Sequence, residues 1–240
     1  MRLLVTRPEP EASELAGRLT ALGHTVLIQP LLRIELAPEL RGIATPAALA
    51  FTSANAVRAI ATWNAAKRWR AVPVFAVGAA TADAVRTAGF SQVTIATGDV
   101  AGLAAAIQSR FDPKLGTVLY PSARDRAGDL EGLLPGFSVA TVEAYRAQAA
   151  TRFDPAVVDA IRTAAIDGVL LFSRRTSEIF VGLAVAAGLV DGLRGTSLYA
   201  LSPQVAEPLA ALAPAPVCVA PHPDQTSLIG LLKPALAHPP

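Results

Sequence analysis

The chain of 240 residues is poor in the residue types that most often carry chemistry. It has one cysteine, Cys218, and three histidines, none of which has metal-ligand spacing with another histidine, a cysteine or a carboxylate. A dinucleotide GxGxxG fingerprint, a phosphate-binding GxxxxGK[ST] loop and a GxSxG nucleophile elbow are all missing. An enzyme built from this chain is therefore expected to use no metal, no nucleotide cofactor and no covalent nucleophile.

Long apolar runs are missing as well. The longest, Phe180–Val190, has about 11 residues, whereas a membrane span needs roughly 18 or more. The apolar start Leu3–Val5 runs directly into Arg7 and Pro8, which is not the pattern of a signal peptide. A single thiol cannot form an internal disulfide, which fits a reducing compartment. We therefore expect a cytoplasmic protein with no membrane partner.

The charge pattern disfavours nucleic acid as a partner. The net charge is only +2, although the pI is near 9.0, and the 21 basic residues are mostly arginines spread along the chain. Arginine suits bidentate recognition of a carboxylate or a phosphate, so an acidic small molecule would satisfy this composition. No long apolar helix face or heptad is left unaccounted for, and we expect a monomer.

The most informative feature that is present is an internal repeat. LAFTSANAV at Leu49–Val57 is matched about 120 positions later by LLFSRRTSEIF at Leu170–Phe180. Phe75–Arg86 is matched by Tyr199–Ala210, and the opening LLVTRPEP by VLYPSARD, which begins at Val118. A repeat of about 120 residues favours two domains, because domains commonly have about 100–150 residues.

Short apolar strand patterns alternate with helical patterns throughout the chain. A helix is expected from about Pro10 to Leu22, ended by Gly23. Strands that are apolar on both faces are typical of parallel sheets covered by helices, which predicts an α/β protein with two five-stranded, flavodoxin-like sheets. The expected strands lie near Leu3–Thr6, Thr25–Gln29, Ala48–Thr52, Val74–Val77, Val93–Ala96, Thr117–Tyr120, Ser138–Thr141, Gly168–Phe172, Ser197–Leu201 and Val217–Ala220.

The periodicity does not decide how the chain divides between these sheets. A cut near residue 116 would give two consecutive repeats. Exchange of the leading βαβ unit would instead give one continuous middle domain and one domain built from both chain ends. That arrangement needs two crossing segments, and Pro30–Pro38 and Glu143–Gln148 are themselves related by the repeat, as PLLR against EAYR.

The ends of the expected strands carry hydroxyls, glycines or arginines just before a helix. Ligands of open α/β sheets bind beyond the carboxyl ends of the strands. Two uses compete for such residues: a serine or threonine can cap the helix, which is worth about 1 kcal/mol, or the helix start can bind an anion through free N–H groups. The candidates are Thr6, Arg7, Thr52, Ser53, Asn55, Gly78, Thr81, Ser122, Arg124, Ser173, Arg174 and Ser202.

These motifs together resemble the uroporphyrinogen-III synthase family of tetrapyrrole biosynthesis. The chain departs from the family at Ser202 and Val205, where many members carry Gly-Pro-x-Thr. The resemblance therefore does not imply a substrate contact by a threonine at position 205. The matching segments span about residues 3–232 and are VTRP at Val5–Pro8, FTSANAV at Phe51–Val57, VGAATADAV at Val77–Val85, EAYR at Glu143–Arg146, LFSRRTSEIF in the second half and LSPQVAEPL before the last strand.

The resemblance implies a fold that the periodicity left open. Two flavodoxin-like domains would be joined by a two-stranded β linker, with a cleft between them and the leading βαβ unit exchanged. Residues 1–34 and 149–240 would form the first domain and residues 38–143 the second. The linkers would lie at about 35–37 and 144–148.

The resemblance also implies an activity. The substrate would be hydroxymethylbilane, a linear tetrapyrrole with eight carboxylates. A cofactor-independent lyase would cyclise it to uroporphyrinogen III with loss of water and inversion of ring D through a spiro intermediate.

Site roles follow by the same resemblance. Tyr145 would assist departure of the hydroxyl as a weak acid or hydrogen-bond donor; the alternative is a strand tyrosine packed at a domain edge. Arg7, Arg124 and Arg174 would lie at the rim of the site. The groups implied to bind substrate carboxylates or the ring system are Thr52, Ser53, Gly78, Thr81, Ser122 and Ser173.

A different class of function fits part of the pattern. Two α/β lobes with a hinge also describe a non-catalytic binding or regulatory module that closes on an anionic ligand. A nucleic-acid-binding protein is the third and least favoured hypothesis.

Overall fold

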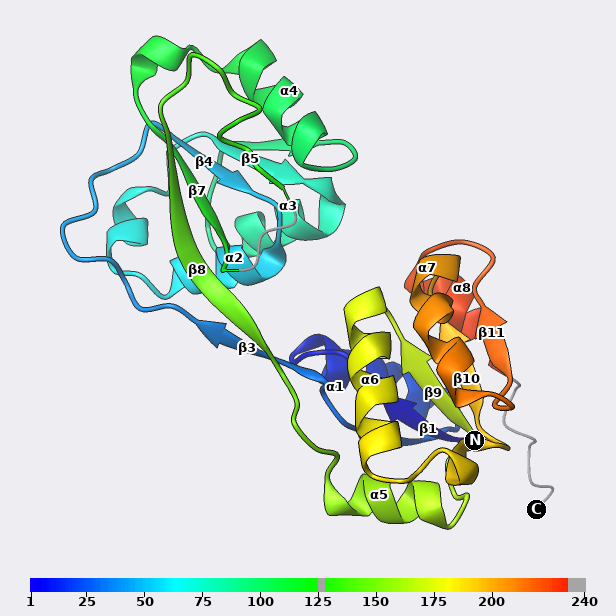
Figure 1. The fold of residues 1–240 in the computed structure, drawn as a ribbon. Helices are drawn as coiled ribbons and strands as arrows, with labels where there is room; N and C mark the ends of the chain where they lie inside the picture. The colour runs from blue at the N-terminus through cyan, green and yellow to red at the C-terminus, as the bar shows by residue number, and fades with distance from the viewer. Residues whose placement is uncertain (125–127, 233–240) are drawn as a thin grey trace. The chain divides into compact units, whose positions relative to one another are not determined.

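The computed structural model describes residues 1–124 and 128–232 (Figure 1). The chain divides into two compact units: unit 1 is Met1–Arg33 with Gln148–Pro240, and unit 2 is Ile34–Ala147. The domain limits expected from the sequence, 1–34 with 149–240 and 38–143, stay a prediction, and residues 233–240 of the first lie outside the described residues.

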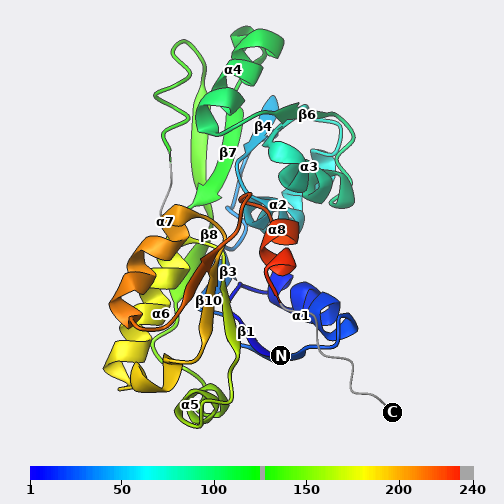
Figure 2. The same ribbon diagram turned by 90° about the vertical axis from the view of Figure 1, so that its right-hand side faces the viewer.

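Unit 1 is built on a parallel sheet of five strands with helices on both faces (Figures 1 and 2). The leading strands lie beside strands from the second half of the chain, because β1 pairs with β9. In spatial order the strands are β2 (Thr25–Ile28), β1 (Arg2–Val5), β9 (Gly168–Leu171), β10 (Ser197–Ala200) and β11 (Val217–Val219). The helices are α1 (Glu11–Ala21) and α8 (Gln225–Gly230) on one face, and α5 (Pro155–Arg162), α6 (Arg174–Ala186) and α7 (Pro203–Ala206) on the other.

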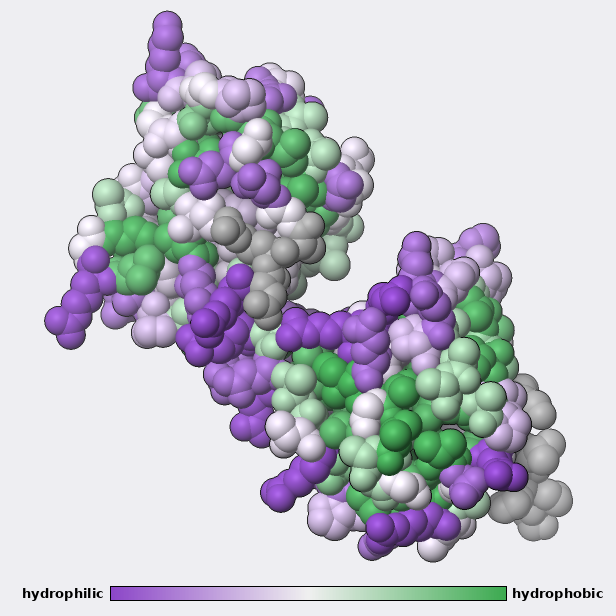
Figure 3. Space-filling view, viewed as in Figure 1, coloured by the Kyte–Doolittle hydropathy of each residue, from purple (hydrophilic) through white to green (hydrophobic). Residues whose placement is uncertain are grey.

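Side-chain alternation along the strands explains the two-faced core of unit 1. Leu3 and Val5 pack on the side of α1, whereas Leu4 packs on the side of α6 against Phe180. Both sides of the sheet are buried, as the apolar strand runs predict. The surface over α6 still carries apolar as well as charged side chains (Figure 3), and Val185 there is 56% exposed.

Unit 2 contains a sheet of six strands, where five were expected. The additional strand is β3, which pairs with β8. Ala37 N–H donates to Ala144 O at 2.7 Å and Ala150 N–H donates to Leu31 O at 2.9 Å, so the two strands run in opposite directions. In spatial order the strands are β6 (Val93–Ala96), β5 (Val74–Val77), β4 (Ala48–Phe51), β7 (Val118–Ala123), β8 (Val139–Ala149) and β3 (Leu32–Leu36).

The helices of unit 2 are placed by the same alternation of strand residues. Leu49 and Phe51 of β4 pack under α2 and α3, whereas Ala48 and Ala50 pack under α4. The helices are α2 (Ala54–Ala61), α3 (Gly78–Thr87) and α4 (Val100–Arg110), and short 3-10 helices lie at η1 (Ala65–Arg68) and η2 (Pro113–Leu115) in unit 2 and at η3 (Asp191–Leu193) and η4 (Glu207–Leu212) in unit 1.

The sequence repeat is a repeat of sheet order. The order β2-β1-β9-β10-β11 in unit 1 corresponds position by position to β8-β7-β4-β5-β6 in unit 2. The corresponding pairs are β1 and β2 in unit 1 and β7 and β8 in unit 2. In unit 1 this pair precedes the other strands along the chain, whereas in unit 2 it follows β4, β5 and β6. A cut near residue 116 is therefore wrong, because it would separate β1 and β2 from β9. The predicted α/β class with two mostly parallel sheets is confirmed.

Candidate functional site

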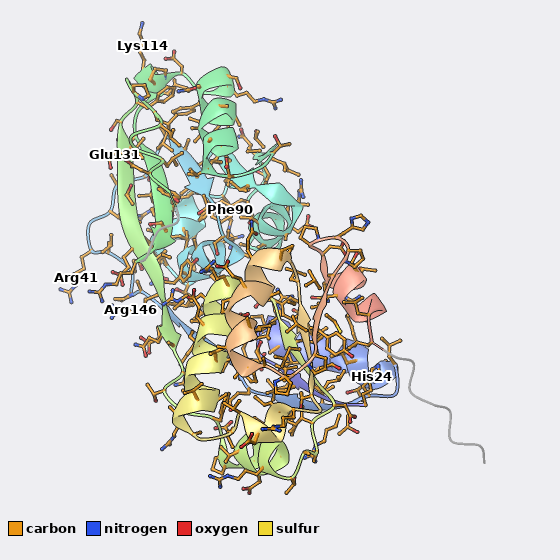
Figure 4. All side chains as sticks on the ribbon, turned by 45° about the vertical axis from the view of Figure 1, so that its right-hand side comes forward. His24, Arg41, Phe90, Lys114, Glu131 and Arg146 are labelled. Atoms are coloured by element: carbon orange, nitrogen blue, oxygen red, sulfur yellow. The ribbon has the colours of Figure 1, made fainter. Side chains whose placement is uncertain are left out.

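Parallel strands bring the predicted site residues of unit 2 to one edge of its sheet. Thr52 and Ser53 follow β4, Gly78 follows β5, and Tyr145 of β8 lies opposite Ala123, the last residue of β7. The carboxyl ends of parallel strands share an edge, which is where ligands of such sheets bind. Figure 4 shows the two edges, with Lys114 before β7 at one end of unit 2 and Arg146 in β8 near the other.

A hydrogen bond joins Tyr145 to Ser53 across this edge. The Tyr145 hydroxyl donates to Ser53 Oγ over 3.1 Å, although the residues are 92 positions apart. Ser53 Oγ also accepts from the backbone N–H of Asn55 at 3.1 Å and thereby caps α2. The predicted cap and the predicted tyrosine thus share one oxygen atom.

A β-bulge in β8 turns Tyr145 toward Ser53. The register of β7 and β8 passes from Ser122 opposite Glu143 to Ala123 opposite Tyr145, so Ala144 is an extra residue in β8. A bulge re-aims the side chains that follow it, and bulges are frequent next to active sites. Ala144 and Tyr145 consequently pack against the same core cluster under α2 and α3, where regular alternation would put them on opposite faces.

Two more polar contacts extend this edge. Thr52 Oγ1 lies 3.2 Å from Tyr120 Oη, which joins β4 to β7. Asn55 Oδ1 accepts from Arg58 Nη1 at 2.6 Å. Tyr120 was not among the predicted site residues, because an aromatic residue inside an apolar strand gives no local sign that its hydroxyl reaches a neighbouring strand.

The start of α3 is open to solvent and lacks a side-chain cap. Gly78 has φ +71°, a left-handed conformation that glycine adopts without steric cost, and a Cβ built there would meet no atom within 4 Å. Ala79 and Ala80 are exposed, whereas Thr81 is only 7% exposed. The first N–H groups of a helix have no intrahelical partner, and the positive helix end favours an anion. This edge can therefore accept a carboxylate.

Ser122 and Arg124 line a separate cavity of about 460 Å³ along β8. Its other lining residues include Glu131, labelled in Figure 4, and Glu143. Val139, which also lines it, packs with the cluster under α4, on the face of β8 opposite to Tyr145. Its charged lining residues are Arg124, Glu131 and Glu143, so the acidic side chains outnumber the basic one. Ser53 is not among the residues that line this cavity.

In unit 1, Arg7 is held at the carboxyl edge of the sheet by neutral groups. Its guanidinium lies 4.6 Å from the centre of the Phe172 ring, and Nη1 donates to Gln225 Oε1 at 2.7 Å. Burial lowers the pKa of Arg7 from its ordinary value, and the charges of Glu11 and Glu14 act in the opposite direction. An arginine stays protonated in proteins, so this edge carries a partly buried positive charge.

The other candidates of unit 1 have structural partners. Arg174 Nε pairs with Glu178 at 2.9 Å and Nη1 with Glu207 at 2.6 Å, and these hydrogen bonds raise its pKa. Ser173 caps α6 in a reciprocal capping box with Thr176. Two carboxylates already compensate the charge of Arg174, which makes it a weaker anion-binding group than Arg7.

Thr6 and Ser202 are the remaining predicted site residues of unit 1. Thr6 is fully buried, and its hydroxyl donates to Leu170 O at 2.7 Å. This hydrogen bond joins the end of β1 to β9. Ser202 precedes α7 and makes no side-chain cap bond. Val205, where many family members have a threonine, is 5% exposed and belongs to the apolar core.

Comparison with known proteins identifies the family. No curated protein matches the sequence. The family model for uroporphyrinogen-III synthase HemD matches residues 13–230. The chain belongs to this family. Uroporphyrinogen-III synthases are enzymes of tetrapyrrole synthesis, so the predicted function is confirmed at the level of the family, and nothing favours the alternative of a non-catalytic binding module.

Solved uroporphyrinogen-III synthases share the fold. The enzyme from Helicobacter pylori 26695 aligns with a TM-score of 0.62 at 16% identity, covering 96% of this chain and 98% of the other. A mutant of the enzyme from the extremely thermophilic bacterium Thermus thermophilus aligns with a TM-score of 0.52 at 19% identity, covering 96% of each chain. At this identity the likeness concerns the fold alone.

Across residues 1–124 and 128–232, no helix is long and apolar enough to cross a membrane. In the same part of the chain, no group of three or more histidine, cysteine, aspartate or glutamate side chains could hold a metal ion.

Proposed function

We propose that the chain is a cofactor-independent, cyclising lyase that converts hydroxymethylbilane to uroporphyrinogen III. Family membership supports the substrate, and one contact carries the assignment of the chemistry: the hydrogen bond of Tyr145 to the cap of α2 at the carboxyl edge of unit 2. This contact places a weak acid beside a helix start that can bind an anion.

The reaction depends more on positioning of the substrate than on acid catalysis. An electron-rich bilane loses its hydroxyl readily to give an azafulvene, and without an enzyme it closes without inversion. No electrons are gained or lost overall, so no electron-carrying cofactor is required. The enzyme holds the chain in the geometry of the inverted closure, and Tyr145 assists departure of the hydroxyl as a weak acid.

Each unit offers groups suited to the substrate carboxylates. In unit 2 these are the uncapped N–H groups at the start of α3, where Gly78 leaves open space. In unit 1 the main group is Arg7, whose guanidinium contacts the neutral side chains of Phe172 and Gln225. Thr52, Asn55 and Ser53 line the same edge as Tyr145 and would contact the substrate there.

The product isomer tests this function directly. Enzymatically generated hydroxymethylbilane is incubated with the protein, and uroporphyrinogens I and III are separated. We expect isomer III to predominate. A mixture that contains only isomer I, which is the product of unassisted closure, would show that the protein is not a synthase.

We also propose that the protein works as a cytoplasmic monomer. Cys218 is a free thiol in β11, which fits a reducing compartment. Light scattering during size-exclusion chromatography should give a mass near 24.8 kDa. A mass of twice that value would contradict the monomer.

A further inference from the structure

The hydroxyl of Ser53 occupies an unusual position in the hydrogen-bond network of unit 2. Its oxygen accepts two hydrogen bonds, from the Tyr145 hydroxyl at 3.1 Å and from Asn55 N–H at 3.1 Å. A hydroxyl oxygen has two lone pairs and one proton to donate. Both acceptor positions of Ser53 are therefore filled, and among the described residues no acceptor is recorded for its own O–H.

The hydroxyl of Tyr145 is the donor in its hydrogen bond with Ser53. Its proton is directed at Ser53, so it cannot be donated to a substrate oxygen at the same time. The β-bulge at Ala144 and the packing of the ring against the core under α2 and α3 hold it in that direction. The outward donor of the pair is therefore Ser53.

We propose that Ser53 is a catalytic residue, the immediate proton donor to the leaving hydroxyl of the substrate, and that Tyr145 supplies the proton that replaces it. This relay rests on the proposed function. It gives Ser53 a second role beside capping α2, and it makes the serine hydroxyl the group that touches the departing oxygen atom.

The proposed step balances. The bond between the hydroxymethyl carbon and its oxygen breaks, and the electron pair stays with the oxygen. That oxygen takes the Ser53 proton and leaves as water, while the Tyr145 proton moves to Ser53 Oγ. The bilane becomes an azafulvenium cation and Tyr145 a phenolate. Ring closure later releases a proton from the attacking pyrrole carbon, and this proton restores Tyr145.

The local charges favour such a relay. Ser53 lies at the positive end of α2, and the first turn of α2 has no acidic residue. Negative charge that develops on the two oxygens is therefore stabilised by the helix start and meets no carboxylate in that turn.

A double-mutant cycle tests the relay by the rate of uroporphyrinogen III formation. Ser53→Gly removes the hydroxyl but should cost little stability, because glycine is well tolerated at helix N-caps. Ser53→Thr keeps the hydroxyl. We expect Ser53→Gly and Tyr145→Phe each to slow the reaction by about 10-fold or more. The double variant should be about as slow as the slower single variant, because both groups act on one proton. Ser53→Thr should retain most of the rate.

The control separates capping from catalysis. Asp99 caps α4 in the same unit by accepting from Ala101 N–H at 2.9 Å and Gly102 N–H at 3.3 Å. Asp99→Ala should lower the melting temperature and leave turnover unchanged.

Two results would overturn the relay in an enzyme that still makes isomer III. One is wild-type turnover in Ser53→Gly, and the other is a double variant in which the two single effects multiply. A wild-type protein that makes only isomer I would instead refute the proposed function itself.

Discussion

The Arg7 guanidinium lies 4.6 Å from the centre of the Phe172 ring, as a cation over an aromatic face. Gln225, 218 positions away in the sequence, accepts a further hydrogen bond from Arg7 Nη1. These contacts restrain the cation without neutralising it. Such a group loses little side-chain entropy when it binds a carboxylate, and for that reason we propose Arg7 as a substrate-binding cation of unit 1.

Removing the Arg7 guanidinium should weaken substrate binding. A hydrogen bond to a charged group is worth about 1.5–3 kcal/mol, so we expect Arg7→Ala to raise KM for hydroxymethylbilane by about 10-fold or more. Gln225→Ala should raise KM less, because it only loosens Arg7. Arg18→Ala, on the exposed side of α1, serves as the control. An unchanged KM in Arg7→Ala would remove Arg7 from the binding site.

Removing the Tyr145 hydroxyl should lower kcat more than it changes KM. We expect Tyr145→Phe to reduce uroporphyrinogen III formation by about 10-fold or more, the usual scale for one acid–base group. The ring and its packing are kept, so the fold should persist. Tyr199→Phe is a matched control, because Tyr199 is a buried tyrosine of β10, at 4% exposure. Turnover equal to wild type in Tyr145→Phe would exclude Tyr145 from the mechanism.

Truncating Phe180 should destabilise unit 1 strongly. Phe180 is fully buried and meets Phe153 edge to face at 5.5 Å between ring centres. Cavity formation predicts a loss of about 3–5 kcal/mol for Phe180→Ala in urea unfolding. Val185→Ala, on the exposed side of the same helix, should stay within about 0.5 kcal/mol of wild type. Similar losses in the two variants would contradict this description of the core.

The contribution of Glu39 to stability should depend on pH. Its carboxylate accepts from Ala65 N–H at 2.8 Å and from Asn64 N–H at 2.9 Å, and these bonds lower its pKa. A carboxyl whose pKa is lowered by folding stabilises the protein above its unfolded pKa, about 4.3, and loses this effect as pH falls through the folded value. Glu39→Ala should therefore lower the melting temperature at pH 7 and have a smaller effect near pH 3. A pH-independent difference between the two proteins would refute this linkage.

Much of the fold could be predicted because its signals are local. Apolar runs of strand length and the helical period of Ala12, Leu15 and Leu19 depend only on neighbouring residues, and the structure buries these side chains. The predicted helix near 10–22 is found at Glu11–Ala21, and Gly23 follows it with φ +83°. The apolar runs did not predict β3 as a sixth strand of the sheet in unit 2, and only the resemblance implied a strand near it, as one arm of the two-stranded linker; β3 is stabilised as a strand by its pairing with β8.

The candidate site could be predicted only in part. The carboxyl ends of the strands were found correctly, because parallel strands bring their ends to one edge whatever the side chains are. The partners of those residues were not, since Arg7 meets Gln225 and Thr52 meets Tyr120 over long separations. The structure also distinguishes Arg7 from Arg174, which two glutamates neutralise.

By itself the sequence determined the α/β class, the repeat and the family, because these follow from residue order and hydrophobic period. Only the tertiary structure decided how the two repeated serines differ. Ser173 bonds to Thr176, three positions along the same helix, whereas Ser53 receives the hydroxyl of Tyr145 from another strand. That contact depends on the strand order of unit 2 and on one extra residue in β8, Ala144. The pairing of strands, which no local pattern encodes, therefore makes one half of a repeated scaffold chemically different from the other.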